Sequence, residues 1–497
     1  MLSALGFARL NHGFPRRLSP QSIVSYQAMR YGSIGIVILL MLGVMLTALL
    51  PCRGQSGTGL PSDATVEPSQ TIPIMYITTA DGNPITSKEE YKRATFYIAD
   101  PAGKVSLGTA AEPLSMNIRG RGHSSWKGDK KPYKLKLDEK LSLMGMPKNK
   151  HWALLKFWAP TMAGMKLGEL MGMAWTPSTK PIEVVLNGDY IGLYLLTETI
   201  RIGKNRVNIY EQPDNNEDAA TIPGGWLVEV DNYKELNQIS FRENDRWIIN
   251  FTYHSPKVLS TAQKDWLTAE FKGINDDIYA PNKATSRWED RIDVDAMARF
   301  FIIQEVMDNP DGFHGSFYLH KDQGEGSKWV AGPIWDLTCM NREKTDYTFR
   351  MKVHYVFAPH WIGELLKYED FSSAVCKVWK EVHPVLSDEW MRYLESCFAP
   401  YEEAYARDKQ RWSGGTFKPL HSAAEELTTA LRRNVDWFDN HLPATPNGIA
   451  LVVPTAGRHI VYTMSGEVVR IAEDYSEALR DLPQGVYIVD NSKVIVP

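Results

Sequence analysis

The chain has 497 residues, which is enough for two or three domains and a large hydrophobic core. Charged residues make up 23% of the chain, and its formal net charge is -4. This balance gives no bulk basic signal for nucleic acid, so we expect no nucleic-acid partner. The 15 tryptophans and 22 tyrosines suit stacking pockets, but they also build ordinary cores, where we expect most of them.

The N-terminal region carries the pattern of an export signal. Residues 34–50 form an uncharged apolar run of 17, arginines precede it, and no acidic residue occurs before Asp63. This arrangement is typical of a signal peptide or a short membrane anchor with its positive side toward the cytoplasm. We therefore expect residues 1–52 to direct export and to provide the contact with the membrane.

Two details of the export signal stay open. Cys52 follows the apolar run as in a lipoprotein signal, whereas Pro51 directly before it departs from that pattern. Translation from Met29 would give an ordinary short signal region. We expect a membrane-anchored protein or a lipoprotein at the periplasm or cell surface.

The chain divides into four parts by composition. Residues 53–71 are rich in Gly, Ser, Pro and Thr and predict a flexible linker. Residues 72–443 predict one large domain in which strands dominate first and amphipathic helices follow from about residue 360, an α+β order. Residues 445–497 predict a small all-β module.

Three local elements are clear from the sequence. Asn187-Gly188 stands between two apolar runs, and this pair favours a two-residue hairpin turn. Helical spacing predicts one helix at about 161–174 and another that begins after Asp293, whose side chain is placed as a cap.

A glycine-rich turn is the first candidate for chemistry. A predicted strand leads into Gly120 and Gly122, and the next strand carries Lys134. Such a turn lets backbone N–H groups approach phosphates, and a lysine on the next strand can neutralise them. The alternative is an ordinary turn, with Lys134 and Lys136 on the wet face of an alternating strand.

Two acidic clusters flank a predicted β-hairpin. Asp308, Asn309 and Asp311 lie in a turn after a helix, and Asp336 follows the strand in "KWVAGPIWD". Two carboxylates and an amide suit Mg²⁺ with bound phosphates, because Mg²⁺ takes few hard oxygen ligands and keeps waters. Protein kinases place their acidic residues at the two ends of a short hairpin in this way. The alternative is a helix end followed by polar turns.

Six ordered blocks between residues 74 and 443 resemble the CotH family, the spore-coat-type kinases with a divergent protein-kinase-like fold. The blocks are "IRGRGHSSW" with "KKPYKLKL"; "LMGMPKNKHWALL"; "VVLNGDYIGLYLLTETIRIGKNRVNIY"; "GGWLVEVD"; "MDNPDGFHGSFYLHKD"; and "GPIWD". The resemblance implies an α+β kinase-like fold with a β-rich N-terminal part and a helical C-terminal part. It also implies an exported kinase that uses ATP with Mg²⁺ or Mn²⁺ and phosphorylates Ser or Thr of a surface or extracytoplasmic protein.

The resemblance also assigns roles to individual residues. It makes Asp311 the catalytic carboxylate, Asp336 and Asn309 metal ligands, and Lys134 the lysine that contacts phosphate. The other assigned residues are Arg119, Gly120 and Gly122 in the loop over the phosphates, Glu198 near the base, and Trp329 as a stacking partner for adenine.

The chain departs from the family pattern in two places. The family usually reads Trp-Asp-Phe-Asp where this chain has Thr338 as the last of the four residues. After the "WALL" block the family usually carries an Asp and an Arg, at about the places of Pro160 and Met165, with Lys166 nearby. Loss of supporting charges can lower activity by orders of magnitude without changing the fold. A weakened pseudokinase or a non-enzymatic surface scaffold is therefore the alternative function.

The acidic residues and the C-terminal tail each allow one further interpretation. Asp308, Asp311 and Asp336 could serve a metal-dependent hydrolase, but no histidine stands with them in metal-ligand spacing. The tail at 445–497 resembles the short β modules at the ends of exported proteins of Bacteroidetes-type bacteria, which implies sorting or surface display. A plain accessory β module is the alternative.

Overall fold

The computed structural model describes residues 68–243, 247–340, 360–414 and 416–442, together with parts of 459–496. The predicted export segment at 1–52, with Cys52 and the apolar run, lies outside the described residues, as does most of the predicted linker. Within the part of the chain that is described, no helix is both long and apolar enough to cross a membrane.

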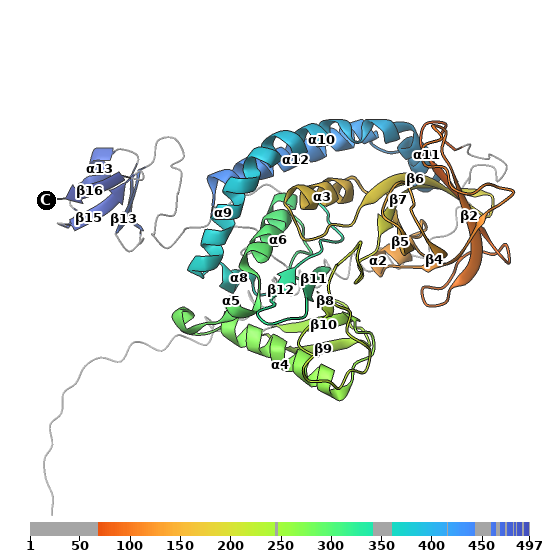
Figure 1. Cartoon of the computed structure of the whole chain (residues 1–497). Helices are drawn as coiled ribbons and strands as arrows, with labels where there is room; N and C mark the ends of the chain where they lie inside the picture. Colours follow the sequence, from red (N-terminus) through yellow and green to blue (C-terminus); the bar gives the residue numbers. More distant parts are fainter. Residues whose placement is uncertain are drawn as a thin grey trace, which may run out of the picture. The chain divides into compact units, whose positions relative to one another are not determined.

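The N-terminal half of the domain is a closed β-barrel (Figure 1). Its strands follow the order β1-β2-β3-β4-β5-β7-β6, and a parallel pairing of β1 with β6 closes it. The strands are β1 (Ile74–Thr79), β2 (Lys92–Ala99), β3 (Leu114–Gly120), β4 (Tyr133–Leu141), β5 (Asn149–Lys156), β6 (Thr179–Leu186) and β7 (Asp189–Glu198). On β4, Leu135 and Leu137 point into the barrel core, and Lys134 and Lys136 lie outside it. This alternation follows from the two-residue period of a strand.

The turn between β6 and β7 confirms the hairpin predicted at Asn187-Gly188. Leu186 pairs with Asp189, and the two residues between them have φ angles of 52° and 81°. Positive φ at both central positions defines the type I′ turn that Asn-Gly favours.

The C-terminal half contains a five-stranded sheet that the sequence analysis did not anticipate. Its order is β12-β11-β8-β10-β9. The strands are β8 (Trp226–Val230), β9 (Gln238–Arg242), β10 (Ile248–Ser255), β11 (Phe317–Lys321) and β12 (Trp329–Ala331). The strands β8, β9 and β10 lie before residue 360, where strands were expected to dominate, and the described elements between residues 360 and 442 are helical, as predicted.

The two faces of this sheet differ in chemistry. Phe251 and Phe317 both pair with Val230, so they share one face. Helix α4 (Thr261–Ile278) covers that face through Phe271, whose ring stacks on Phe251 at 4.0 Å. Helix α6 (Val294–Met307) also covers it. The opposite face carries polar side chains and forms part of the site described below.

Helix α6 begins as predicted. The Asp293 side chain caps it by accepting a hydrogen bond of 2.9 Å from the Ala296 N–H. The helix predicted at 161–174 is α3 (Ala159–Leu170), which begins two residues earlier and ends four residues earlier. Gly172, with φ of 66°, lies just beyond the end of α3.

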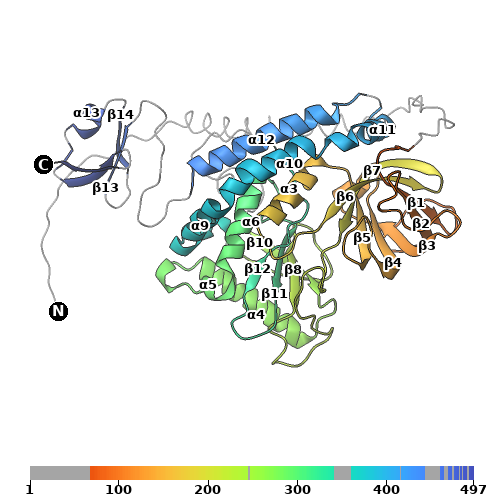
Figure 2. The same ribbon diagram turned by 45° about the horizontal axis from the view of Figure 1, so that its top comes forward.

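A layer of helices covers α3 and α6 (Figures 1 and 2). The long members are α9 (Glu369–Val385), α11 (Glu402–Trp412) and α12 (Leu420–Asn440). The shorter elements are α2 (Ser124–Lys127), α5 (Trp288–Arg291), α8 (Ile362–Leu365), α10 (Met391–Ser396), a π-helical turn at Leu386–Trp390, and 3₁₀ turns at Lys283–Thr285 and Ala399–Tyr401. Helix α11 reaches back across the molecule and lies against the barrel strand β7.

The C-terminal tail forms its own small sheet of order β14-β13-β15-β16. Its elements are β13 (His459–Thr463), β14 (Val468–Ala472), the short helix α13 (Tyr475–Leu479), β15 (Gly485–Val489) and β16 (Ser492–Val496). The tail was expected to be all-β, and α13 corrects that expectation. Ala478 of this helix joins the small core of the sheet.

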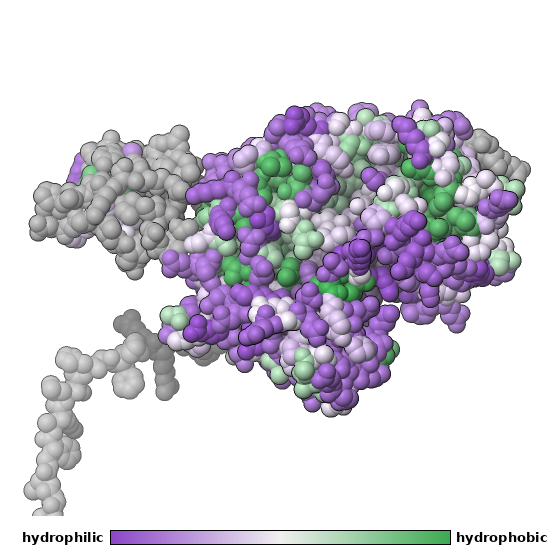
Figure 3. Space-filling view, in the orientation of Figure 1, coloured by the Kyte–Doolittle hydropathy of each residue, from purple (hydrophilic) through white to green (hydrophobic). Residues whose placement is uncertain are grey.

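The surface gives no strong hint of a broad apolar interface on the face seen in Figure 3. That face is mostly hydrophilic, and its hydrophobic patches are small and separated.

Candidate active site

The β11–β12 hairpin brings the two acidic clusters together. Its strands are antiparallel, with Leu319 opposite Ala331. Asp311 precedes β11 and Asp336 follows β12, so both lie at the open end of the hairpin. The charge of Asp336 contributes to the raised pKa of Asp311, as expected for neighbouring carboxylates.

Asp311 lies in a tight turn after α6. Its carbonyl oxygen accepts hydrogen bonds from the N–H groups of His314 (3.1 Å) and Gly315 (2.9 Å). Burial raises the pKa of its carboxyl, and the negative charge of Asp336 raises it further. The chain enters the turn through Asp308, which has a left-handed φ of 48° and is 2% exposed.

Asn309 holds a buried acceptor atom without a donor. The residue is 2% exposed, and its Nδ2 donates to Gln304 Oε1 at 2.7 Å. Its Oδ1 has no hydrogen-bond partner. Buried polar atoms usually find partners, so an unpaired amide oxygen next to a carboxylate turn suits a cation.

Asp336 faces the barrel across the site. Its φ is 52°, and the Arg121 guanidinium from the β3–β4 loop is its main cationic neighbour. Burial raises the pKa of the Asp336 carboxyl, Arg121 lowers it, and the charge of Glu229 raises it. Arg121 itself lies over the Trp335 ring, 5.4 Å from its centroid.

The polar face of the five-stranded sheet adds a second acidic group. Glu229 on β8 is 2.7 Å from His254 Nε2 and accepts a hydrogen bond from the Tyr318 hydroxyl. Asp231 directly follows β8, and its carboxylate accepts a hydrogen bond from the Tyr233 N–H at 2.9 Å. Burial, then Glu229, raises the pKa of Asp231.

The outer face of the barrel supplies a matching cationic wall. Burial lowers the pKa of Lys134 to about 8, and its main charged neighbours are all cationic: Arg119, Arg201, Arg121 and Lys257. These positive charges repel one another, and a bound anion would reduce that repulsion. Lys134 is therefore a half-buried cation at a site suited to phosphate, whereas Lys136 is exposed, as the wet-face alternative expects.

His151 on the neighbouring strand β5 lies near the same positive charges. Burial lowers its pKa to about 3, with Arg201, Lys134, Lys136 and Lys257 adding to the effect. Its Nδ1 is buried without a hydrogen-bond partner. A neutral imidazole beside several cations leaves the positive charge of this wall uncompensated.

The glycines of the β3–β4 loop serve packing. A Cβ on Gly120 would come within 2.4 Å of the Trp126 ring, and one on Gly122 within 2.1 Å of Ser125 Oγ. The N–H groups of Gly120 and Arg121 already donate to the carbonyls of Ser87 and Pro132. These two N–H groups are thus unavailable to phosphate, and the loop contributes the Arg121 side chain in their place.

Two predicted site residues lie in other environments. Glu198 is 1% exposed, accepts the Ser178 N–H at 2.9 Å and forms a buried ion pair with Arg206. Trp329 is fully buried, with its ring 4.6 Å from that of Phe271. A ring with no exposed face cannot stack on adenine, so Trp329 belongs to the core.

The departures from the family pattern form neutral contacts. Trp158 Nε1 donates to Thr338 Oγ1 at 3.2 Å, and Thr161 Oγ1 donates to the Leu337 carbonyl at 3.1 Å. Pro160 lies in the first turn of α3, where proline is favoured. Where the family pattern has charged residues, these described contacts of the chain join neutral groups.

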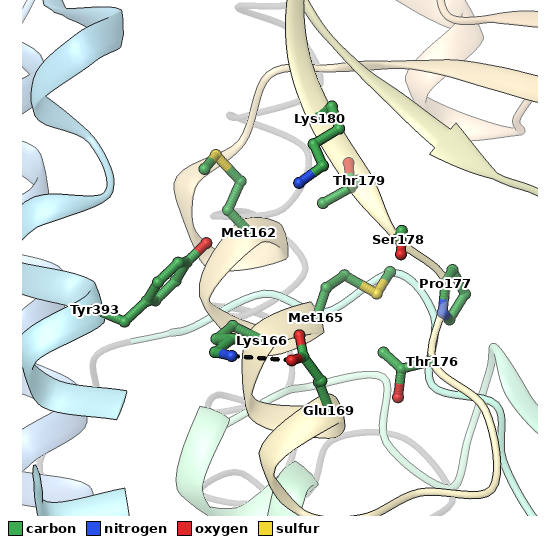
Figure 4. Close-up of a pocket in the computed structure, with 10 residues that line it drawn as sticks. All are labelled: Met162, Met165, Lys166, Glu169, Thr176, Pro177, Ser178, Thr179, Lys180 and Tyr393. Carbon is green, nitrogen blue, oxygen red and sulfur yellow. Dashed lines mark hydrogen bonds and ion pairs between the residues drawn. The ribbon is translucent and has the colours of Figure 1, made fainter. Parts of the chain in front are cut away.

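Met165 and Lys166 line a separate recess on α3, shown in Figure 4. Lys166 pairs there with Glu169 at 3.0 Å, and the Tyr393 ring forms the opposite side. Neither Asp311 nor Asp336 lines this recess. Lys166 therefore does not replace the missing arginine at the candidate site.

A cross-contact spans the mouth of the site. His123 from the β3–β4 loop stacks on Tyr233 at 4.0 Å and lies 3.1 Å from Glu235. Asn232 of the same segment lies 3.1 Å from His314 Nε2, beside the Asp311 turn. The loop that carries Arg121 is thus held to the acidic side of the site.

Sequence reasoning missed Arg121, Glu229 and Asp231. Arg121 stands between the two glycines that attracted attention, and the other two alternate on the "WLVEVD" strand. Acidic residues at every second position of an otherwise apolar strand were the available signal.

The donor set fits Mg²⁺. Asp336 and the free Oδ1 of Asn309 are hard oxygen donors, and Mg²⁺ bound to phosphates needs only one or two protein carboxylates. Among the described residues no three His, Cys, Asp or Glu side chains are grouped to hold a metal alone.

Fold and site together define an α+β protein in which a cationic barrel face opposes a pair of acidic side chains. A family model described as CotH kinase protein matches residues 118–442, and the chain belongs to this family. No curated protein matches the chain.

Proposed function

We propose that this protein is a kinase that transfers the γ-phosphate of ATP to Ser or Thr of an exported protein. The observation that carries the proposal is the meeting of Lys134, Arg119 and Arg121 with Asp311 and Asp336 at one site. Basic side chains match the nucleotide phosphates, and acidic side chains match a metal ion and an acceptor hydroxyl.

The roles follow from the chemistry of each group. Asp336 and Asn309 would hold Mg²⁺ or Mn²⁺, which supplies charge neutralisation of the phosphates when bound. Lys134 and Arg121 bind phosphate oxygens. Asp311 orients the acceptor hydroxyl and takes its proton, while the new O–P bond forms and the bond to the β-phosphate bridging oxygen breaks, so that ADP leaves.

The raised pKa of Asp311 suits this role. Burial and the nearby Asp336 charge make its carboxylate a better proton acceptor than a solvated one. A cation between the two carboxylates would relieve their repulsion. We therefore expect the charges of the site to be balanced best when the metal and the nucleotide are both bound.

The test is phosphate transfer from labelled ATP with the full chain and candidate acceptor proteins. Asp311→Asn should lower transfer at least a hundredfold and leave nucleotide binding unchanged. Glu325→Gln, an exposed residue in the turn between β11 and β12, is the matched control. Transfer that survives in Asp311→Asn would disprove the assignment.

A pseudokinase or scaffold is the second candidate function. The observation in its favour is the neutral Trp158–Thr338 contact, where the family pattern has an acid. A pseudokinase would bind ATP, whereas a scaffold would not. Neither would transfer phosphate to an acceptor protein.

We also propose that the protein is exported and held at the membrane through residues 34–50 or through Cys52. The apolar run and its preceding arginines support this. Protease accessibility in whole cells tests it, since an exported domain is cleaved without lysis and a retained one is not.

A further inference from the structure

A recess of about 380 Å³ has Asp336 in its lining, whereas Lys134 does not line it. The β3–β4 loop, the end of β5, the start of α3 and helix α11 form its walls. Its charged lining consists of Arg121, Lys130, Lys156, Lys409, Asp336 and Asp408. Cations therefore outnumber carboxylates four to two in this recess.

Two of the cations are already matched. Lys130 forms a buried ion pair with Asp408. Arg121 has Asp336 as its main opposite charge. These pairs account for both carboxylates of the recess.

The other two cations, Lys156 and Lys409, form no ion pair with a carboxylate among the described residues. Lys156 Nζ lies against the loop, 3.2 Å from where a Cβ on Gly128 would be. Burial, then the charge of Lys131, lowers the pKa of Lys156, and the negative charge of Asp129 opposes this shift. Lys409 on α11 contributes only a contact with the Tyr405 ring, 5.0 Å from its centroid. An anionic group in the recess would be attracted by both.

Aromatic side chains complete the walls. Phe157 and Trp412 line the interior, and Trp158 is 51% exposed. The Trp158 indole N–H is bonded to Thr338, so its ring is held in place. Fixed rings beside free ammonium groups suit a peptide segment with acidic side chains better than they suit a bare ion.

The recess is distinct from the cationic barrel wall assigned to the nucleotide. The charged neighbours of Lys134 are Arg119, Arg201, Arg121 and Lys257, none of which except Arg121 lines the recess. The two basic regions share Arg121, whose main opposite charge is Asp336. If nucleotide phosphates occupy the first region, the second faces the reacting phosphate from another side.

We propose that this recess binds an acidic segment of the acceptor protein next to its phosphorylated Ser or Thr. The inference rests on the proposed kinase function. Lys156 and Lys409 attract the acidic side chains, and Trp158 and Trp412 contact the backbone and apolar atoms of the segment.

The experiment compares two peptides of equal length with one central Ser, flanked either by Asp or by Asn. Binding to the full chain is measured by fluorescence anisotropy at low salt without ATP, so that the readout does not depend on transfer. Wild type should bind the Asp peptide at least tenfold more tightly. Lys156→Gln/Lys409→Gln should reduce that preference to less than twofold, because both unpaired charges are gone.

The matched control is Lys140→Gln/Lys180→Gln, which removes the same charge from two exposed lysines outside the recess. It should keep the wild-type preference. Equal binding of both peptides to wild type, or the same loss in both double variants, would overturn the proposal. Loss of the Mg-ATP melt shift in Lys156→Gln/Lys409→Gln would also overturn it, because the recess would then belong to the nucleotide. A retained Asp preference without transfer to either peptide would support the recess and count against the kinase activity instead.

Discussion

Three charged side chains meet where the β3–β4 loop passes the end of the β11–β12 hairpin. Arg121 offsets part of the repulsion between Asp336 and Asp311, which would otherwise face each other in a partly buried site. The arrangement has one cation for two carboxylates. A bound divalent ion would complete the balance, which explains why the same residues suit both a metal and phosphate.

Thr338 is the residue at which this site departs most from its family pattern. We predict that Thr338→Asp strengthens metal binding, because it adds a hard oxygen donor two residues from Asp336 and the Trp158 N–H can still donate to it. The Mg²⁺ concentration that gives half of the nucleotide-induced melt shift should fall about tenfold, or about 1.4 kcal/mol. Thr338→Asn, which adds no charge, should leave this concentration unchanged. Equal behaviour of the two variants would show that position 338 does not face the metal.

At the scale of elements, one buried carboxylate joins three segments next to the site. Glu243 is 3% exposed and follows β9. It accepts hydrogen bonds from Tyr279 at the end of α4 (2.8 Å) and from the Trp361 N–H before α8 (2.9 Å), and it pairs with His360 Nδ1. Burial raises its pKa, but these partners outweigh burial, and its pKa is lowered from 4.5.

This shift predicts a pH dependence of stability. A carboxyl with a lowered folded-state pKa stabilises the fold above its unfolded pKa, and that contribution is lost as pH falls through the folded value. Glu243→Gln should therefore cost about 2 kcal/mol of unfolding free energy near pH 7, and the difference from wild type should shrink below about pH 4.5. Urea unfolding of both proteins at several pH values measures it. A difference that stays constant with pH would contradict the ionised state of Glu243.

The elements also show how far sequence reasoning reaches. The Asn187-Gly188 turn, the Asp293 cap and the β11–β12 hairpin carry local signals, so each was predicted. The β8–β10 strands were missed as a sheet, because β8 pairs with β11 some ninety residues later along the chain and such a pairing leaves no local pattern. The role of Arg121 was missed for the same reason, since its partner Asp336 is distant in sequence. Trp329 was misplaced because an aromatic residue at the start of a strand gives the same sequence pattern whether its ring is buried or exposed.

At the scale of the whole molecule, α11 fastens the helical layer to the barrel. Asp408 on this helix accepts the Leu193 N–H at 2.9 Å and pairs with the buried Lys130. Gly192 permits this approach, because a Cβ there would lie 2.1 Å from Asp408 Oδ1. Arg407 adds a second buried pair with Glu183 at 3.0 Å. The barrel is thus joined to the helical layer through α11, in addition to the contact of its β3–β4 loop with Tyr233 and Glu235.

We predict that Asp408→Ala destabilises the protein by about 3–5 kcal/mol, because it leaves the Lys130 ammonium buried without its counter-charge. Lys130→Met/Asp408→Leu should recover most of that loss. Asp189→Ala breaks the exposed pair with Arg411 on the same helix and should cost less than about 1 kcal/mol. Urea unfolding measures all three. A cost for Asp408→Ala as small as that of Asp189→Ala would show that α11 is not a fastening element.

The central claim is that the barrel wall and the acidic hairpin end form one metal-nucleotide site. The most direct measurement is a thermal melt of the full chain with and without ATP, at saturating Mg²⁺ or Mn²⁺, for wild type and Asp336→Asn. Binding to the native state at a hundredfold excess over Kd contributes about 2.7 kcal/mol, which raises the melting temperature by several degrees. The account predicts this rise only with metal and only in wild type. No rise with either metal would contradict the site and leave the scaffold function in its place.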